Sequence, residues 1–220
     1  PTTLHISHGL LHGGGAQHSE SPFGMYWNLP GIEIAAPSGA REVKGLLTTA
    51  IKSDNPTIVL THAFIYGAED DVPEGDFEIP FGEANVVREG GDVTIVACSM
   101  MTSIARGAAE ELAGEGINAE VIDLRTLVPL DEKTILDSVA KTGHLVVTDE
   151  GRMRCGLASE IAALVSEKGL DSLKAPIARV ARTDAPVAAN QIQEEYIAPT
   201  AEKIVSAARQ VVGEVPAAAA

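Results

Sequence analysis

The sequence predicts an α/β fold in which parallel strands are covered by helices. Apolar runs of strand length alternate along the chain with segments whose apolar residues recur at helical spacing. Hydrophobic residues make up 45% of the 220 residues but aromatic residues only 4%, so Val, Ile, Leu and Ala must fill most of the core. That composition is typical of a parallel sheet buried on both faces.

The first repeating unit lies between residues 32 and 61. We expect strands at 32–36 and 57–61 and a helix at 40–52, which ends before Pro56 because proline disfavours helix in the residue before it. A strand–helix–strand unit predicts parallel strands with a right-handed crossover. The predicted inner face of the helix consists of Val43, Leu46, Leu47, Ala50 and Ile51.

This unit is too small to bury both faces of a sheet. We therefore expect residues 1–66 to be the second half of a domain whose first half is missing. The segment that follows, 67–91, is rich in Asp, Glu, Gly and Pro, which predicts a solvated acidic linker. Ile79-Pro80-Phe81 is expected to anchor the middle of that linker.

The alternation becomes more regular after residue 92. The spacing of Ile104, Ala108 and Leu112 predicts one helix, and Asp131 is expected to cap the next. Two further helices are predicted at 158–168 and at 200–212. The strands between them are expected at 93–98, 119–124, 144–148 and 176–181. Residues 92–214 thus predict a complete doubly wound α/β domain, and residues 215–220 a frayed tail.

Composition and charge exclude several classes of function. The formal net charge of -15 opposes a nucleic-acid partner, because phosphate backbones need clustered Lys and Arg. It permits a basic protein partner, although solubility alone is the simpler interpretation. No apolar run is long enough to span a membrane, and no signal peptide is visible. Cys98 and Cys155 cannot form a disulfide framework, which favours a reducing compartment.

Histidines are the most conspicuous candidates for chemistry, and four of the six lie in the first 18 residues. His5, His8, His12 and His18 could suggest a metal site, but their spacing matches no familiar zinc pattern. Gly13-Gly14-Gly15 predicts a flexible loop ahead of His18. A histidine on such a loop can enter a cleft and exchange protons near neutral pH, or it can simply face solvent. The glycines match no phosphate-binding motif.

A second candidate is the acidic pair Asp149-Glu150. It lies at the carboxyl end of a predicted strand, where open α/β sheets place their ligands. The pair could bind a metal or a basic partner. It could equally be a polar turn into Gly151.

Several stretches, in one order across nearly the whole chain, resemble the beta subunit of the decarboxylating component of 2-oxo acid dehydrogenase complexes. They are GAQHSES at 15–21, LPGIEIAAP at 29–37, AREVKGLLTTAIKSDNP at 40–56, REGGDVTIV at 88–96, VIDLRTLVP at 121–129, SVAKTG at 138–143 and SEIA at 159–162. The resemblance covers pyruvate, acetoin and branched-chain members alike. It implies part of a thiamine-diphosphate pyrimidine-type domain followed by a transketolase C-terminal-like domain.

The resemblance also implies an activity and partners. Two alpha and two beta subunits would form a heterotetramer, with thiamine diphosphate and magnesium at the alpha–beta interface. The alpha subunit would hold the diphosphate and magnesium, and the beta subunit the aminopyrimidine. The complex would oxidatively decarboxylate a 2-oxo acid such as pyruvate and pass the acyl unit to a lipoyl group of an acyltransferase. His18 matches the active-site histidine of the family, and we expect it to donate a proton in acyl transfer.

The family further carries a structural potassium site formed largely by backbone carbonyls. That site maps onto Thr2, Ala50, Ile51, Ser53 and Asn55. The acidic C-terminal domain is expected to dock a small basic domain of the acyltransferase. The compartment implied is a bacterial cytoplasm or a mitochondrial matrix.

One departure from the family pattern bears on activity. In the family, the glutamate that activates the pyrimidine ring belongs to a segment upstream of the position that corresponds to Pro1, so we expect the isolated chain to be inactive. A non-catalytic assembly domain that holds the alpha subunit and acyltransferase is therefore an alternative. A transketolase or deoxyxylulose-phosphate synthase fragment is another.

Overall fold

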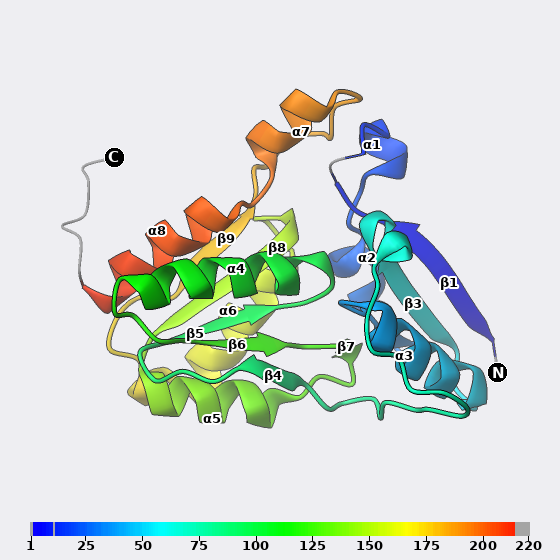
Figure 1. Ribbon diagram of the computed structural model, residues 1–220, viewed down its shortest axis with the longest axis horizontal. Helices are drawn as coiled ribbons and strands as arrows, with labels where there is room; N and C mark the ends of the chain where they lie inside the picture. The colour runs from blue at the N-terminus through cyan, green and yellow to red at the C-terminus, as the bar shows by residue number, and fades with distance from the viewer. Residues whose placement is uncertain (1, 11, 214–220) are drawn as a thin grey trace.

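The computed structural model describes residues 2–10 and 12–213 and forms two sheets with helices packed on them (Figure 1). The α/β class predicted from the sequence is confirmed. Within the described residues, no helix combines the length and apolarity needed to cross a bilayer. The predicted tail at 215–220 lies outside the described residues.

The N-terminal sheet has the strand order β1-β3-β2-β7. Its parallel strands are β1 (Thr3–His8), β2 (Glu33–Ala35) and β3 (Thr57–His62), and α3 (Ala40–Lys52) connects β2 to β3 as predicted. Leu46 and Ala50 are buried on the inner face of α3. The prediction for Ile51 was wrong, since its side chain is 66% exposed. It lies about 100° around the helix from Ala50, beyond the stripe that meets the sheet.

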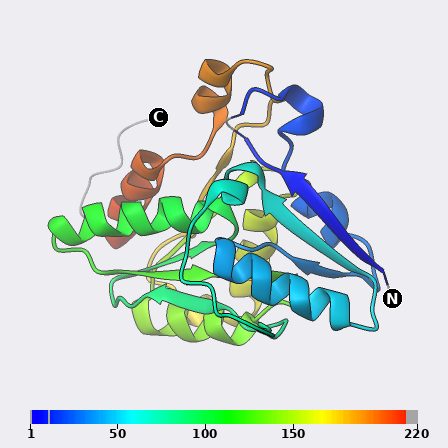
Figure 2. The same cartoon turned by 45° about the vertical axis from the view of Figure 1, so that its right-hand side comes forward.

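The C-terminal sheet has the order β4-β6-β5-β8-β9, in which only β4 is antiparallel to its neighbour. One face is covered by α4 and α8 and the other by α5 and α6 (Figures 1 and 2). The strands are β4 (Asn85–Arg88), β5 (Val93–Ala97), β6 (Ala119–Asp123), β8 (Leu145–Arg152) and β9 (Ala178–Arg182). The helices are α4 (Met100–Gly114), α5 (Glu132–Thr142), α6 (Leu157–Lys168) and α8 (Ala201–Val212).

Local signals explain where these elements begin and end. Asp131 caps α5 as predicted, because its side chain accepts a hydrogen bond from the backbone N–H of Thr134 at 3.0 Å. Gly143 then ends the helix in the left-handed conformation, with φ at 79°. In the acidic segment, Ile79 is buried and its N–H donates to the carbonyl of Gly45, so the predicted anchor is confirmed. The carboxyl end of that segment forms β4 and joins the sheet.

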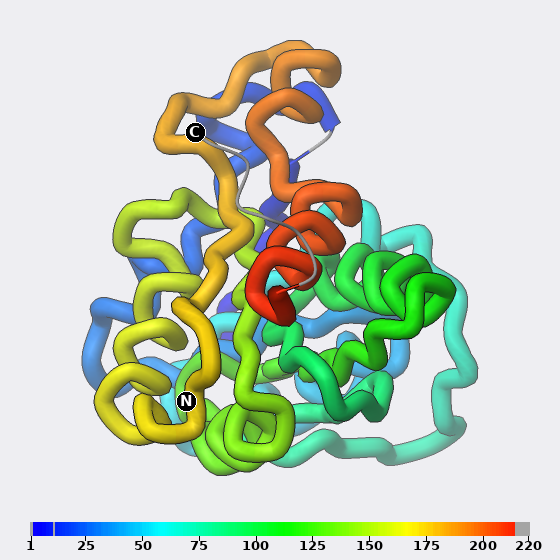
Figure 3. Tube along the Cα trace, turned by 90° about the vertical axis from the view of Figure 1, so that its left-hand side faces the viewer, coloured from blue at the N-terminus to red at the C-terminus, as the bar shows by residue number. Residues whose placement is uncertain are grey.

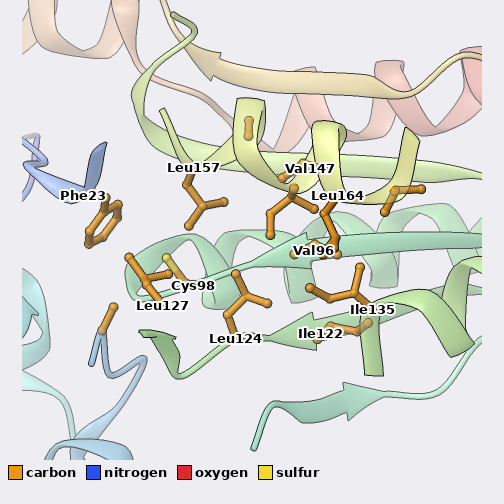
Figure 4. Packing of buried hydrophobic residues seen from close by; sticks show 14 of the residues in the cluster. Phe23, Val96, Cys98, Ile122, Leu124, Leu127, Ile135, Val147, Leu157 and Leu164 are labelled. Carbon is orange, nitrogen blue, oxygen red and sulfur yellow. The ribbon is translucent and has the colours of Figure 1, made fainter. Parts of the chain in front are cut away.

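The two sheets share one hydrophobic core. Strand β7 (Thr126–Val128) follows β6 of the C-terminal sheet but pairs antiparallel with β2 of the N-terminal sheet. Around it, Phe23 and Leu60 from the N-terminal part pack in the same cluster as Leu157 from α6. Figure 4 shows Phe23 facing this cluster beside Leu157, Cys98 and Leu127. The sheets are therefore held together by both strand pairing and apolar packing.

Three short helices complete the fold. They are α1 (Gly15–His18), α2 (Phe23–Trp27) and α7 (Gln191–Ile197), and a 3-10 turn, η1 (Ala63–Gly67), follows β3. Of the three helices, α1 and α7 lie near the top of Figure 1. The chain places α7 beside α1 although more than 170 residues separate them, as Figures 1 to 3 agree. A C-terminal element thus lies against the glycine-rich loop.

Candidate active site

His18 is the last residue of α1 and lines a cavity of about 940 Å³. The cavity lies between the carboxyl end of β8 and the N-terminal loop, so both parts of the molecule contribute to it. Its lining residues are Ile6, Ser7, His12, Ala16, Gln17, His18, Glu20, Ser21, Pro22, Phe23, Gly24, Met25, Tyr26, Ala63, Asp149, Gly151, Arg152, Arg154, Cys155 and Gly156. The expectation that a loop histidine reaches a cleft is met by this geometry.

The cavity combines an apolar wall with polar groups on the loop. Ile6, Phe23, Met25 and Tyr26 present hydrocarbon and ring surface that suits a flat heterocycle or an aliphatic chain. His18 is exposed, and its ring has no hydrogen-bond partner among residues 2–10 and 12–213. Its imidazole is therefore available to exchange a proton with a bound molecule.

A buried polar network lies directly behind the cavity and centres on Glu150. One carboxylate oxygen accepts hydrogen bonds from the backbone N–H of Leu10 at 3.0 Å and from Nε2 of His62 at 2.9 Å. The other accepts from the hydroxyl of Ser21 at 2.7 Å. Glu150 is only 5% exposed, so its charge is satisfied almost entirely by protein groups.

The network keeps Glu150 ionised and His8 neutral. Burial alone would raise the pKa of Glu150, but the hydrogen bonds from His62 and from the Ser21 hydroxyl hold it below its usual value. Burial lowers the pKa of His8 to about 4, although the charge of Glu150 opposes this shift. The His8 ring lies 3.4 Å from the hydroxyls of both Ser21 and Ser99.

Asp149, the neighbour of Glu150, is buried as well. Burial raises the pKa of Asp149 to about 6, while backbone N–H donors, including Gly151 at 2.7 Å and Ala158 at 3.3 Å, favour its charged form. The interpretations of the acidic pair as a polar turn or as a surface for a basic partner are thus corrected, because β8 continues through the pair to Arg152 and both side chains are buried.

The middle of the glycine-rich loop is also held by charged residues of the C-terminal part. The N–H of Gly13 donates to Glu194 of α7 at 2.9 Å, and this glutamate is fully buried. Glu20 forms an ion pair with Arg182, which lies on β9 and is fully buried too. Arg152 approaches the same glutamate at 3.5 Å. The loop therefore contacts three C-terminal elements.

The five positions expected to form the potassium site lie together around the ends of α3 and β3. The carbonyl of Thr2 accepts from the N–H of Thr57, and that of Ala50 accepts from the hydroxyl of Thr3 at 3.0 Å. The side chains of Ser53 and Asn55 donate to Glu33. Each carbonyl oxygen keeps a second lone pair, so the arrangement fits a cation held by backbone oxygens. The site stays a prediction.

Other histidines are dispersed. His5 lies beside Thr61 and Tyr66, and His144 contacts the carbonyl of Asp92. Among the described residues, no group of three or more His, Cys, Asp or Glu side chains could hold a metal ion.

Sequence reasoning missed most of the buried network. His8, His62 and Glu150 each lie at or near the carboxyl end of a parallel strand, which is the signal that could have joined them. Arg182 ends the parallel strand β9 and carried the same signal, whereas Glu194 carried none, because it lies on α7 and its partner Gly13 is 181 residues away.

Comparison with family models agrees with this two-part architecture. Residues 1–67 match the pyrimidine binding domain of transketolase, and residues 82–204 match the transketolase C-terminal domain.

Similar proteins of known function are beta subunits. The chain is 45% identical over 195 residues to the beta subunit of acetoin:2,6-dichlorophenolindophenol oxidoreductase of Cupriavidus necator, covering 89% of this chain and 58% of that protein. It is 41% identical to the pyruvate dehydrogenase E1 component subunit beta of Rickettsia felis, covering 89% and 60%. The chain therefore spans about 60% of the length of these relatives.

A solved structure supports the same fold. A split-gene transketolase, described as an inactive beta4 tetramer, superposes with a TM-score of 0.80 and 27% identity over 96% of this chain and 66% of that one.

Proposed function

Because this chain belongs to the transketolase-like family of 2-oxo acid dehydrogenase beta subunits, we propose that it forms the beta part of a thiamine-diphosphate-dependent complex. The complex would oxidatively decarboxylate a 2-oxo acid, pyruvate being the first candidate, and transfer the acyl unit to a lipoyl group. One observation carries the proposal. His18, which matches the active-site histidine of the family, lines a cavity between the two sheets, and its ring forms no hydrogen bond with any described residue.

The cavity has the right chemistry for part of this task. Its apolar and aromatic wall suits the aminopyrimidine ring of the cofactor, and His18 can hold and deliver a proton at its imidazole. When bound, the cofactor supplies the electron sink for decarboxylation. Magnesium would be held with the diphosphate by the alpha subunit. Potassium would stabilise the carbonyl cluster at Thr2, Ala50, Ile51, Ser53 and Asn55.

The carboxylates of the cavity indicate that residues outside this chain are needed to activate the pyrimidine ring. The carboxylates on its lining are Glu20, which is paired with Arg182, and Asp149, which accepts backbone hydrogen bonds. Both carboxylates are therefore already engaged by protein groups. This supports inactivity of the isolated chain and keeps assembly without catalysis as the second candidate. The proposed partners are the alpha subunit, a second beta subunit and the lipoyl acyltransferase.

The test is reconstitution with an alpha subunit, the beta-subunit segment that carries the pyrimidine-activating glutamate of the family, magnesium, thiamine diphosphate, pyruvate and a lipoyl domain. We expect acyl transfer with the native chain and a loss of roughly 100-fold or more with His18→Gln, since positioned proton transfer contributes on that order. His144→Gln is the matched control, because His144 lies outside the cavity and should change turnover little.

Two outcomes would contradict the proposal. Unimpaired acylation of the lipoyl domain by His18→Gln would remove the assigned role of His18. Tight binding of the alpha subunit without any turnover would instead assign the chain to assembly.

A further inference from the structure

The loop that carries His18 is held from both ends by a single buried side chain of the other sheet. The N–H of Leu10 precedes the loop and the hydroxyl of Ser21 follows it, and both donate to Glu150. Leu10 lies 140 positions before Glu150 in the sequence, and Ser21 lies 129 positions before it. Glu150 therefore ties the two ends of the loop together, beside a longer backbone hydrogen bond from the N–H of Gly9 to the carbonyl of Glu20 at 3.4 Å.

Inside the loop, few contacts compete with this anchor. The short internal bonds are those from Gly14 N–H to Ser19 and from Ser19 N–H to the carbonyl of Gly15. Gly13, Gly14 and Gly15 give the backbone wide conformational freedom, and two of them have positive φ. Because the His18 ring has no partner of its own among the described residues, its position follows from where the backbone is held.

The anchor is not needed to hold the sheets together. Strand β7 already pairs with β2 across the boundary, and Phe23 already packs beside Leu157 in the shared core. Burial of a carboxylate is strongly unfavourable unless hydrogen-bond donors surround it. The presence of Glu150 at this buried position must therefore be explained by something other than cohesion of the sheets. All three donors to Glu150 come from the N-terminal part, and two of them flank the His18 loop.

We propose that Glu150 is a positioning residue: through Leu10 and Ser21 it sets the place of His18 in the cavity. Glu194, at Gly13, and Arg182, at Glu20, support the same loop from α7 and β9. The C-terminal domain thus supports the His18 loop in addition to lining part of the cavity. This inference deepens the proposed function and rests on it for the role of His18, but the anchoring itself is a property of this chain.

The physical consequence is a loss of precision when the anchor is removed. Hydrogen bonds to an ionised carboxylate are about twice as strong as neutral ones, and buried donors left without an acceptor carry the full cost of desolvation. A displacement of about 1 Å at a catalytic group can lower a rate on the order of 100-fold. Loosening the loop should therefore reduce turnover more than substrate binding.

The experiment compares two isosteric variants at the end of the loop. Ser21→Thr keeps the hydroxyl that Glu150 accepts, whereas Ser21→Val has the same shape without it. Glu150→Leu removes the acceptor itself. Glu120→Leu is the control, since Glu120 is another buried glutamate of the same sheet but pairs with Lys141 and does not contact the loop.

Amide hydrogen exchange of the full chain measures directly how firmly the loop is held. In Ser21→Val and Glu150→Leu, amides of residues 12–20 should exchange about tenfold faster, while α4 keeps its protection. Ser21→Thr and Glu120→Leu should leave the loop unchanged. Equal protection of the loop in all variants would overturn the proposal, and so would equal loss of protection in the loop and in α4.

Turnover in the reconstituted complex reads the consequence for His18. With pyruvate and a lipoyl domain, kcat should fall about tenfold or more in Ser21→Val while KM for pyruvate stays within about twofold, and Ser21→Thr should restore kcat. Full turnover by Ser21→Val despite a loosened loop would overturn the positioning role. If the native chain shows no turnover with any alpha subunit, the proposed function fails, and hydrogen exchange still decides whether Glu150 anchors the loop.

Discussion

His8 is a base kept neutral by its surroundings. It is 2% exposed, and burial lowers its pKa from 6.5 to about 4. The unfolded chain takes up a proton at this position near pH 6.5, whereas the folded chain does so only near pH 4. Acid therefore favours the unfolded state across that window. The stability that His8 permits is fully present above pH 6.5 and is lost as the pH falls toward 4.

Replacement of His8 should flatten the acid side of the stability profile. Between about pH 7 and pH 4.5, His8→Gln is expected to lose about 2 kcal/mol less unfolding free energy than the native chain. Asp123 and Asp149, whose pKa values burial raises to about 6, act in the opposite direction in both proteins, so the difference isolates His8. Urea unfolding at both pH values measures it. Parallel pH profiles for the two proteins would contradict the assignment.

At the level of single residues, the sequence was informative about His18 and less so about its support. A flexible glycine run before a histidine, together with the family resemblance, pointed to one of the residues that line the cavity. Glu150 was noticed only as part of an acidic pair at a strand end. Its donors could not be predicted, because Leu10, Ser21 and His62 meet it only after two sheets have packed together.

Two helical glycines differ in how much space surrounds them. Gly45 in α3 faces the acidic segment so closely that an added Cβ would lie 2.4 Å from Ile79 and 2.9 Å from Phe77. Gly107 in α4 is exposed, and an added Cβ would meet nothing within 4 Å. The same substitution to alanine therefore tests packing at one site and helix propensity at the other.

We expect Gly45→Ala to destabilise the chain by about 1–3 kcal/mol, because overpacking outweighs the better helix propensity of alanine. Gly107→Ala should stabilise it by about 0.5–1 kcal/mol, since alanine reduces the conformational freedom of the unfolded chain. Thermal unfolding of both variants and of the native chain shows whether each substitution raises or lowers the stability. A stabilising Gly45→Ala would mean that the segment around Ile79 does not pack on α3 as described.

The elements that sequence patterns predicted are those with strong local signals. The helices α3, α5 and α8 have apolar stripes with caps or stops, and β5, β6 and β8 each contain a short run of Val, Ile or Leu. The strand β7 has three residues, follows a turn at Arg125, where φ is 57°, and pairs with a strand of the other sheet, so no local pattern announces it. The helix α7 is mostly polar, and its position depends on the buried contact between Glu194 and Gly13.

For the whole molecule, the shared core implies cooperative unfolding of the two parts. The residues that match two family models are joined by β7 and by one apolar cluster that includes Phe23, Leu60 and Leu157. Trp27, the single tryptophan, packs against that cluster from the N-terminal part. Its fluorescence therefore reports on the N-terminal part, while circular dichroism reports on all helices.

A substitution far from Trp27 tests this coupling. Ile204 is fully buried in α8, within the cluster on the outer face of the C-terminal sheet. Ile204→Ala should cost about 2–5 kcal/mol and lower the denaturation midpoint seen by both probes equally, because unfolding of one part exposes the core of the other. Ile192→Ala is the control, since Ile192 is 77% exposed and its loss should shift neither midpoint. A midpoint that moves by circular dichroism but not by Trp27 fluorescence would show that the N-terminal part unfolds independently, and the shared core would then contribute little to the stability of either part.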